Sequence, residues 1–143
     1  MIFLSAGNNE LSFLRFFLRF EKIFYELNKK NVEVICQVGH TEYKNKDFKI
    51  IKFLEKKKFN KLIRKSSIFI SHAGAGSIID SIQNQKIPIL LPRKKKFKEH
   101  VDDHQVELYE KLLQNNLASS FKQIYNLKNK KFLVKSKKKR ILF

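Results

Sequence analysis

One segment of the sequence, residues 68–83, joins a strand pattern directly to a helix pattern. An apolar, β-favouring stretch at residues 68–71 is followed by Gly74, Gly76 and Ser77, after which apolar residues recur at helical period. Glycine permits positive φ and lets a ligand approach the main chain closely. The free N–H groups in the first turn of a helix attract anions. The segment therefore predicts a buried strand that turns tightly into a helix, with a phosphate or pyrophosphate site at the turn.

This pattern alone leaves a second interpretation open. The sequence has no G-x-x-x-x-G-K-[ST] loop, and Ile79 stands where the dinucleotide-binding fingerprint has its third glycine. The two glycines could then serve only to let the helix pack against the sheet.

A later segment repeats the arrangement. A strand-like stretch at residues 87–91 is followed by a basic stretch and then by apolar residues at helical spacing. Asp102 or Asp103 falls near the start of this second helix, where carboxylates are favoured, and His104 and Gln105 fall in its first turn. Because ligands bind at the carboxyl edge of open α/β sheets, the two helix N-termini together predict a cleft at that edge.

The whole chain alternates short apolar strand patterns with helix patterns, which argues for a parallel sheet covered by helices on both faces. A length of 143 residues corresponds to one domain. We place this domain at residues 1–120 and a basic tail at residues 121–143. Strands are predicted at residues 1–6, 32–38, 50–54, 68–71 and 87–91. Helices are predicted at about residues 11–28, after a turn at residues 7–10, and at residues 56–65, 77–85 and 100–115.

Three motifs in this order resemble one known family. They are SHAGAGS at residues 71–77, the aliphatic strand that ends in Pro92-Arg93, and EHVDDHQ at residues 99–105. Over roughly residues 1–120 the chain resembles the donor-binding domain of family 28 glycosyltransferases. More narrowly, it resembles the small subunit of two-chain enzymes, of the bacterial PssE/EpsE type or the eukaryotic Alg13 type. The resemblance implies a Rossmann-like parallel sheet, equivalent to the donor-binding half of a GT-B glycosyltransferase.

A GT-B enzyme needs two such halves, so the resemblance implies a chain that is active only with a partner subunit. It would be the donor-binding or catalytic subunit of an inverting enzyme that transfers a hexosyl or N-acetylhexosaminyl group. The donor would be a UDP-sugar, and the acceptor a polyprenyl-diphosphate-linked sugar in capsule or exopolysaccharide biosynthesis. The partner would be a membrane-anchored Alg14/PssD-like protein, which would hold this cytoplasmic chain on the inner face of the cytoplasmic membrane. A non-catalytic nucleotide-binding scaffold remains an alternative.

The resemblance also assigns donor-binding roles to residues at the ends of the predicted strands. The backbone of residues 74–77, which we call the glycine corner, would hold the diphosphate. Asp80 would bond the ribose hydroxyls, and the backbone of Leu54 would contact the uracil. Asp80 could instead be a solvated carboxylate that stabilises the helix dipole. The expected donor-binding residues are Gly7, Leu54, Gly74, Ala75, Gly76, Ser77, Asp80 and Gln105.

The candidates for a catalytic role are Asn8 and His72. Asn8 lies at the end of the first strand, where related subunits usually carry Gly-Thr-His or a similar trio, but Asn9 cannot act as a general base. An Asn-rich turn that caps a helix is the alternative interpretation. His72 precedes the glycine corner and is the histidine best placed to touch a phosphate. A core role for His72, bonded to a strand carbonyl, fits equally well.

No metal and no cofactor are expected. His40, His72, His100 and His104 lack the short paired spacing of a zinc site, and Cys36 is the one cysteine. Cys36 lies in an apolar strand pattern, which indicates a buried residue rather than a nucleophile. Inverting enzymes of the resembled family neutralise the leaving diphosphate with helix dipoles and backbone amides.

The formal net charge of +18 indicates an anionic partner. Most of the basic residues are lysines, whereas guanine recognition favours arginine, and no zinc-finger, RRM or KH signature is present. We therefore attribute the charge to compositional bias together with attraction to an anionic membrane surface, and a basic nucleic-acid-binding module is the weaker alternative.

Two segments could contact that membrane or a partner. Phe13, Phe16, Phe17, Phe20 and Phe24 recur at helical spacing in the first helix, which indicates either ordinary core or a docking stripe. The C-terminal residues 135–143 pair a polybasic run with an apolar end, which suits anionic lipid or an acidic groove, although a disordered tail would have the same composition.

Overall fold

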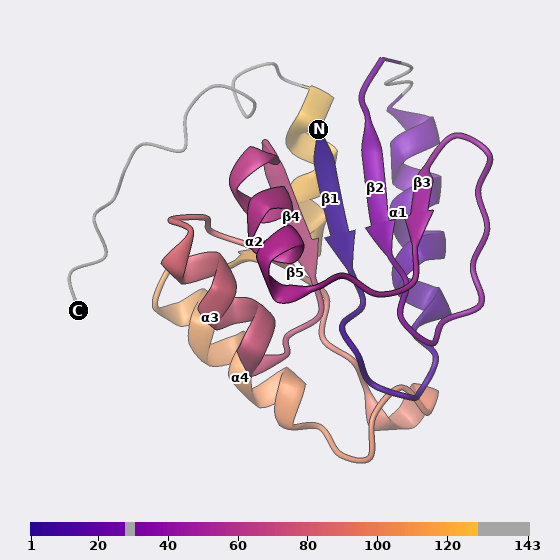
Figure 1. The fold of residues 1–143 in the computed structure, drawn as a ribbon. Coiled ribbons are helices and arrows are strands. Elements are labelled where there is room, and N and C mark those ends of the chain that lie inside the picture. Colours follow the sequence, from indigo (N-terminus) through magenta and orange to yellow (C-terminus); the bar gives the residue numbers. More distant parts are fainter. Residues whose placement is uncertain (28–30, 129–143) are drawn as a thin grey trace.

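The computed structural model describes residues 1–27 and 31–128, which are built around a six-stranded sheet (Figure 1). All paired strands run parallel, in the order β3-β2-β1-β4-β5-β6. The predicted α/β fold with a parallel sheet is therefore confirmed. The strands are β1 (Ile2–Ser5), β2 (Val34–Gln37), β3 (Lys49–Ile51), β4 (Ile68–Ser71), β5 (Ile89–Leu90) and β6 (Ser119–Ser120).

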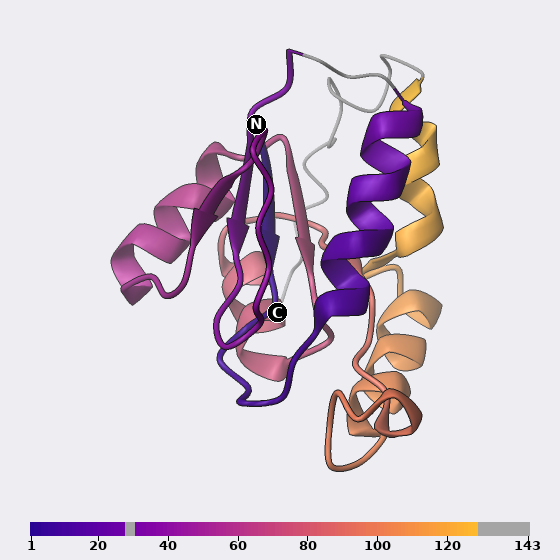
Figure 2. The same cartoon turned by 90° about the vertical axis from the view of Figure 1, so that its right-hand side faces the viewer.

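Helices cover both faces of this sheet. In the side view, α1 and η2 lie on one side of the strands and α2 on the other (Figure 2). The helices are α1 (Leu14–Glu26), α2 (Lys56–Lys65), α3 (Ala75–Gln83) and α4 (His104–Gln114), with 3-10 turns η1 (Lys95–Phe97) and η2 (Phe121–Lys128). Among the residues described, no helix is long and apolar enough to cross a bilayer.

Alternate residues of β1 and β4 contribute to two of the three hydrophobic clusters. Leu4 and Ile70 belong to the cluster beneath α1 and η2, whereas Phe3 and Phe69 pack with Phe59 of α2. Because both faces are covered, every residue of β1, β2 and β4 is buried. This explains why these strands are almost continuously apolar in the sequence.

The phenylalanine stripe of α1 is core. Phe13, Phe16, Phe17, Phe20 and Phe24 are all buried, none being more than 7% exposed. The alternative interpretation of this stripe as a docking surface is therefore wrong, because the sheet and η2 already cover these rings.

Several predicted boundaries are also wrong. The first helix begins at Leu14 and not directly after the turn at residues 7–10, and the last helix begins at His104 and not at residue 100. In both places a loop precedes the helix, at residues 7–13 and 92–103, and the two loops hold each other through hydrogen bonds. Strand β3 ends at Ile51, so Leu54 lies beyond the strand rather than at its end. Helix α3 begins at Ala75 instead of residue 77.

The first part of the predicted tail is folded. β6 pairs with β5, and the η2 turn that follows buries Phe121 and Ile124 in the main core. The boundary placed at residue 120 therefore cuts through the folded unit. Residues 129–143, which include the polybasic run, lie outside the described residues.

Candidate functional site

A cavity of about 350 Å³ opens at the carboxyl edge of the sheet, where β1, β2 and β4 end. It brings together residues that lie far apart in the sequence, as expected for open α/β sheets. The predicted site residues that line it are Gly7, Asn8, Leu54, His72, Gly76, Ser77 and Asp80. The predicted residues outside its lining are Gly74, Ala75 and Gln105.

The backbone conformation of the glycine corner differs from the one that the sequence predicted. Gly74 has an ordinary φ of −84° and precedes α3, and Gly76 lies inside α3. The expected positive φ is therefore wrong at both positions; among the described glycines it occurs at Gly7 (+72°) and Gly39 (+57°).

Glycine is required at position 74 for a different reason, because a side chain there would collide with the His72 ring. A Cβ atom on Gly74 would lie 2.1 Å from His72 Nε2, and one on Gly7 would lie 2.4 Å from His72 Cε1. The imidazole ring thus fits between two glycines, which a side chain at either position would displace. A Cβ atom on Gly76 would meet nothing within 4 Å.

This difference allows a matched test of the corner. Gly74→Ala should destabilise the fold by roughly 1–3 kcal/mol, because the buried His72 ring must move. Gly76→Ala should leave stability unchanged or raise it by about 0.5–1 kcal/mol, since alanine is favoured over glycine in helices. Urea denaturation of the two variants measures both effects. Equal stability of the two variants would show that the ring does not set the requirement for glycine.

His72 is buried and uncharged at neutral pH. Burial lowers its pKa to about 4, and the nearby Arg93 and His100 act in the same direction. Its Nδ1 lies 3.2 Å from Ser71 Oγ, which donates a hydrogen bond to the Ser5 carbonyl. His72 therefore faces the cavity as a neutral ring and brings no positive charge to a phosphate.

Asp80 is the acidic residue of the cavity and is only 5% exposed. Its alternative interpretation as a solvated carboxylate is wrong. Lys56 Nζ lies 2.6 Å from Asp80 Oδ1, but the geometry of this contact is not that of a hydrogen bond, and Oδ1 has no other partner among the described residues. Buried polar atoms almost always have a partner, so this oxygen is well suited to a ligand hydroxyl.

The amides of α3 begin beside this carboxylate. No side chain caps the N-terminus of α3, whose first turn includes Gly76 and Ser77 at the cavity. The cavity thus combines helix N–H groups, which suit an anion, with a carboxylate, which suits hydroxyl donors.

The loop after β1 completes one wall. Asn8 is exposed and lines the cavity. Asn9 Oδ1 accepts a hydrogen bond from the Leu11 N–H at 2.8 Å, whereas α1 starts later and has no side-chain cap. The alternative interpretation of the Asn pair as a helix cap is therefore wrong, because Asn9 instead shapes the loop that carries Gly7 and Asn8.

Gln105 has a contact outside the cavity. Its Oε1 accepts a hydrogen bond from the Arg93 N–H at 3.1 Å, which fixes the chain just after β5. Leu54 does line the cavity, after the end of β3.

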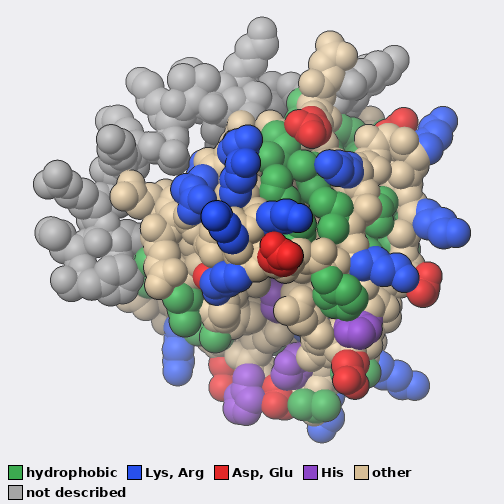
Figure 3. All heavy atoms as spheres, viewed as in Figure 1, with side chains coloured by type: hydrophobic (Ala, Val, Ile, Leu, Met, Phe, Trp, Pro, Cys, Tyr) green, Lys and Arg blue, Asp and Glu red, His purple; other side chains and the backbone are tan. Residues whose placement is uncertain are grey.

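Four lining residues were missed from the sequence: Ser5, Gln37, Lys56 and Phe59. Ser5 and Gln37 are polar residues at the carboxyl ends of apolar strands, and this signal could have identified them. Lys56 starts α2, whose outer face carries a group of Lys and Arg side chains (Figure 3). Nothing in the local pattern distinguishes Lys56 from the lysines that follow it.

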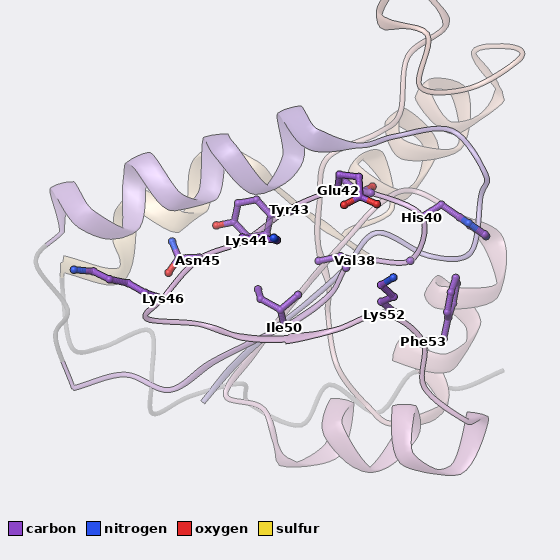
Figure 4. A pocket seen from close by; sticks show the side chains of 12 residues that line it. Val38, His40, Glu42, Tyr43, Lys44, Asn45, Lys46, Ile50, Lys52 and Phe53 are labelled. Carbon is purple, nitrogen blue, oxygen red and sulfur yellow. The ribbon is translucent and has the colours of Figure 1, made fainter.

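A larger hollow of about 680 Å³ lies along residues 38–53, between the end of β2 and the segment that contains β3 (Figure 4). Val38, Tyr43 and Ile50 line it together with lysines, and His40 and Phe53 meet edge to face at 5.0 Å. None of the predicted site residues reaches it. The smaller cavity is the stronger candidate because it combines a helix N-terminus with a buried carboxylate, whose Oδ1 is ion-paired with Lys56 but accepts no hydrogen bond.

Metal ligands do not cluster in the described part of the chain, where no group of three His, Cys, Asp or Glu side chains could hold an ion. Cys36 is buried, and burial raises the pKa of its thiol to about 12.

Three solved structures with a similar fold are glycosyltransferases. The calicheamicin glycosyltransferase CalG4 matches with a TM-score of 0.63 at 12% identity, over 94% of this chain and 34% of that one. The glycotransferase of kitacinnamycin matches with a TM-score of 0.62 at 13% identity, over 83% and 29%. SnogD from Streptomyces nogalater matches with a TM-score of 0.59 at 11% identity, over 92% and 36%. These matches confirm the predicted equivalence to one half of a GT-B fold.

A sequence relative supports the same family. The UDP-N-acetylglucosamine transferase subunit ALG13 of Candida albicans is 35% identical over 74 residues, which is 52% of this chain and 24% of that protein. The chain thus spans about a quarter of the length of this relative. The model of the glycosyltransferase family 28 C-terminal domain matches residues 7–141. The chain therefore belongs to glycosyltransferase family 28, whose C-terminal domain it matches, and the resemblance inferred from its motifs is confirmed.

Proposed function

We propose that this chain is the donor-binding subunit of a two-component inverting glycosyltransferase. It binds a UDP-sugar and passes its hexosyl or N-acetylhexosaminyl group to a polyprenyl-diphosphate-linked acceptor in capsule or exopolysaccharide biosynthesis. A membrane-anchored Alg14/PssD-like subunit supplies the acceptor site and holds the chain at the cytoplasmic membrane. Family membership supports this reaction class, and the Candida relative is itself described as a transferase subunit.

The observation that carries the proposal is the buried carboxylate of Asp80 beside the open N-terminus of α3. In this assignment the ribose diol donates to Asp80, and Lys56 moves aside from Oδ1. The diphosphate lies against the amides of Gly76 and Ser77, where the positive end of the α3 dipole stabilises it. The uracil lies against the backbone at Leu54.

In the transfer step, the acceptor hydroxyl attacks the anomeric carbon in line as the bond to the UDP oxygen breaks. The configuration inverts, and the departing diphosphate keeps the bonding electrons. The amides of α3 stabilise the negative charge that develops on it. Asn8 faces the cavity and is placed to donate hydrogen bonds to the sugar donor. The neutral His72 ring packs against Gly7 and so supports the loop that carries Asn8. The proton of the acceptor passes to a base, which this assignment leaves to the partner subunit.

The ribose assignment is tested with Asp80→Ala and Asp80→Asn. Loss of the ionised acceptor should weaken UDP binding by about 1.5–3 kcal/mol, the usual contribution of a hydrogen bond to a charged group. Isothermal calorimetry with UDP measures this change, and Asp80→Asn keeps the volume of the side chain. Glu107→Ala, which removes an exposed carboxylate of α4, serves as the matched control. UDP affinity that is unchanged in a folded Asp80→Ala protein would exclude the ribose role.

We further propose that the reaction needs no metal, because helix N–H groups are placed to neutralise the diphosphate. Turnover by the assembled enzyme should then survive EDTA within about twofold, since no ion bridges the phosphates. A strict requirement for added Mn²⁺ or Mg²⁺ would contradict this part of the proposal while leaving the ribose assignment intact.

A further inference from the structure

One surface outside the cavity combines exposed apolar and basic side chains. Leu14, Leu18 and Phe97 are 40%, 49% and 48% exposed, and Leu11 is 36% exposed. The exposed basic residues that accompany them are Arg19, Lys95, Lys96 and Lys98, together with the partly exposed Arg15. We name these nine residues the Phe97 patch.

The patch is continuous although its two halves are far apart in the sequence. The guanidinium of Arg15 lies over the Phe97 ring, 4.7 Å from its centroid, and also forms two hydrogen bonds with Glu99 at 2.7 Å. Both ribbon views place residues 92–103 beside the N-terminal end of α1 (Figures 1 and 2). Leu14 and Leu18 lie one helical turn apart on α1, next to Arg15.

The loop that presents Phe97 is braced. The Lys94 N–H donates to Glu99 Oε2 at 3.0 Å, and the Lys95 N–H donates to Asp103 Oδ1 at 2.9 Å. Lys98 adopts φ of +56°, a conformation that non-glycine residues rarely hold without support. Phe97 is therefore held outward by the fold, and its exposure is not the result of a loose loop.

The composition of the patch favours a lipid surface over a protein. Lysine is depleted in protein–protein interfaces, whereas aromatic and aliphatic side chains surrounded by lysine suit the headgroup region of an anionic bilayer. The nearby Glu99 is buried and paired with Arg15, so it offers little repulsion. Asp102 and Asp103 lie toward the α4 end of the loop, where they bond His100, His104 and the Lys95 amide.

The patch also lies at the same edge of the sheet as the cavity. Residues 7–14 lead from the cavity wall at Gly7 and Asn8 to Leu11 and Leu14. Arg93 ties this segment to the loop after β5 by donating to the Ala6 and Leu11 carbonyls at 2.7 Å. A bilayer under the patch would thus lie close to the cavity without covering α2 and α3, which line its other side.

We propose that the Phe97 patch docks this chain directly on an anionic phospholipid bilayer, with Phe97, Leu14 and Leu18 in the headgroup region and the lysines on lipid phosphates. This contact is additional to any membrane subunit and does not depend on the donor assignment.

The test is sedimentation of the full chain with phosphatidylcholine vesicles that contain phosphatidylglycerol. Lys95→Glu combined with Lys96→Glu should weaken binding at least about tenfold, because each basic residue near the surface contributes appreciably. Phe97→Ser should weaken it severalfold at unchanged charge. Residues 129–143 are present in every variant and contribute equally.

Two matched controls separate docking from general attraction by a cationic protein. Lys57→Glu combined with Lys61→Glu makes the same charge change on α2, and Phe53→Ser removes another ring that is 48% exposed. These controls should bind nearly as the wild type does, and UDP affinity and thermal stability should be unchanged in the patch variants.

The proposal is overturned if the wild type does not bind the anionic vesicles, or if the α2 control loses as much binding as the patch variant. It is also overturned if the patch variants keep vesicle binding but no longer co-purify with a membrane subunit, because the surface would then belong to a protein. A failure of UDP binding in all variants would refute the donor site and leave the vesicle result unaffected.

Discussion

The purified chain is expected to bind a UDP-sugar weakly and to transfer no sugar until the proposed partner subunit is added. The candidate cavity lies at one edge of a single sheet, and the chain covers only 29–36% of the three glycosyltransferase structures described above. Without the second half, nothing holds the acceptor in line with the anomeric carbon. Orientation of reactants can account for roughly 7–11 kcal/mol of a barrier, so its loss should leave almost no turnover.

The measurement is transfer of radiolabelled sugar to a polyprenyl-diphosphate-linked acceptor, with and without a co-expressed membrane subunit. In the complete assembly, Asp80→Ala should lower transfer at subsaturating donor by roughly 10–150-fold, which corresponds to the loss of about 1.5–3 kcal/mol expected for UDP binding, and this would show that turnover uses the cavity. Efficient transfer by the chain alone would refute the half-enzyme proposal. An assembly that transfers equally well with Asp80→Ala would instead support the scaffold alternative.

The sequence predicted the elements whose signals are local. Strand β4 and helix α2 have the predicted bounds, because an apolar run between turn signals and a helical apolar period are complete within a few residues. The predicted ends of the strands therefore also indicated where the cavity lies, because parallel strands bring their carboxyl ends to one edge of the sheet. This is why the sequence alone was enough to group Gly7, His72 and Asp80 in one site.

What the sequence could not show depends on contacts between distant segments. The loops at residues 7–13 and 92–103 replace predicted helical turns because Arg93 and Arg15 join them across more than 75 positions of the chain. Likewise, the need for glycine at residue 74 comes from the ring of His72 and not from backbone conformation. The basic composition after residue 120 suggested a tail, although Phe121 and Ile124 have the spacing of one buried helical face.

Arg93 makes the strongest of these long-range contacts, and we expect Arg93→Met to lower the stability of the fold greatly. Arg93 is only 1% exposed, and its guanidinium lies over the Phe13 ring at 4.6 Å. It donates to the carbonyls of Ala6, Leu11 and Glu99 at 2.7, 2.7 and 3.0 Å. Burial lowers the pKa of Arg93 to about 10, which still leaves the side chain charged at neutral pH.

Arg93→Met keeps much of the apolar volume but leaves these three carbonyls without their donor. At about 1–3 kcal/mol for each carbonyl left without its donor, the free energy of unfolding should fall by at least about 3 kcal/mol. Urea denaturation measures this loss, and Arg64→Met, which removes an exposed arginine with one bond to Asn84, should change it by less than about 1 kcal/mol.

Arg93→Lys is a milder substitution, which can be measured if Arg93→Met does not fold. A single ammonium lacks the planar fork that reaches three separate carbonyls, so an intermediate loss is expected. Because Ala6 and Leu11 flank the loop of Gly7 and Asn8, UDP affinity should fall in folded Arg93→Lys while Arg64→Lys binds normally. A stability of Arg93→Met within about 1 kcal/mol of the wild type would mean that water satisfies these carbonyls as well as arginine does. The loop that carries Gly7 and Asn8 would then owe its position to the packing of the His72 ring, and not to Arg93.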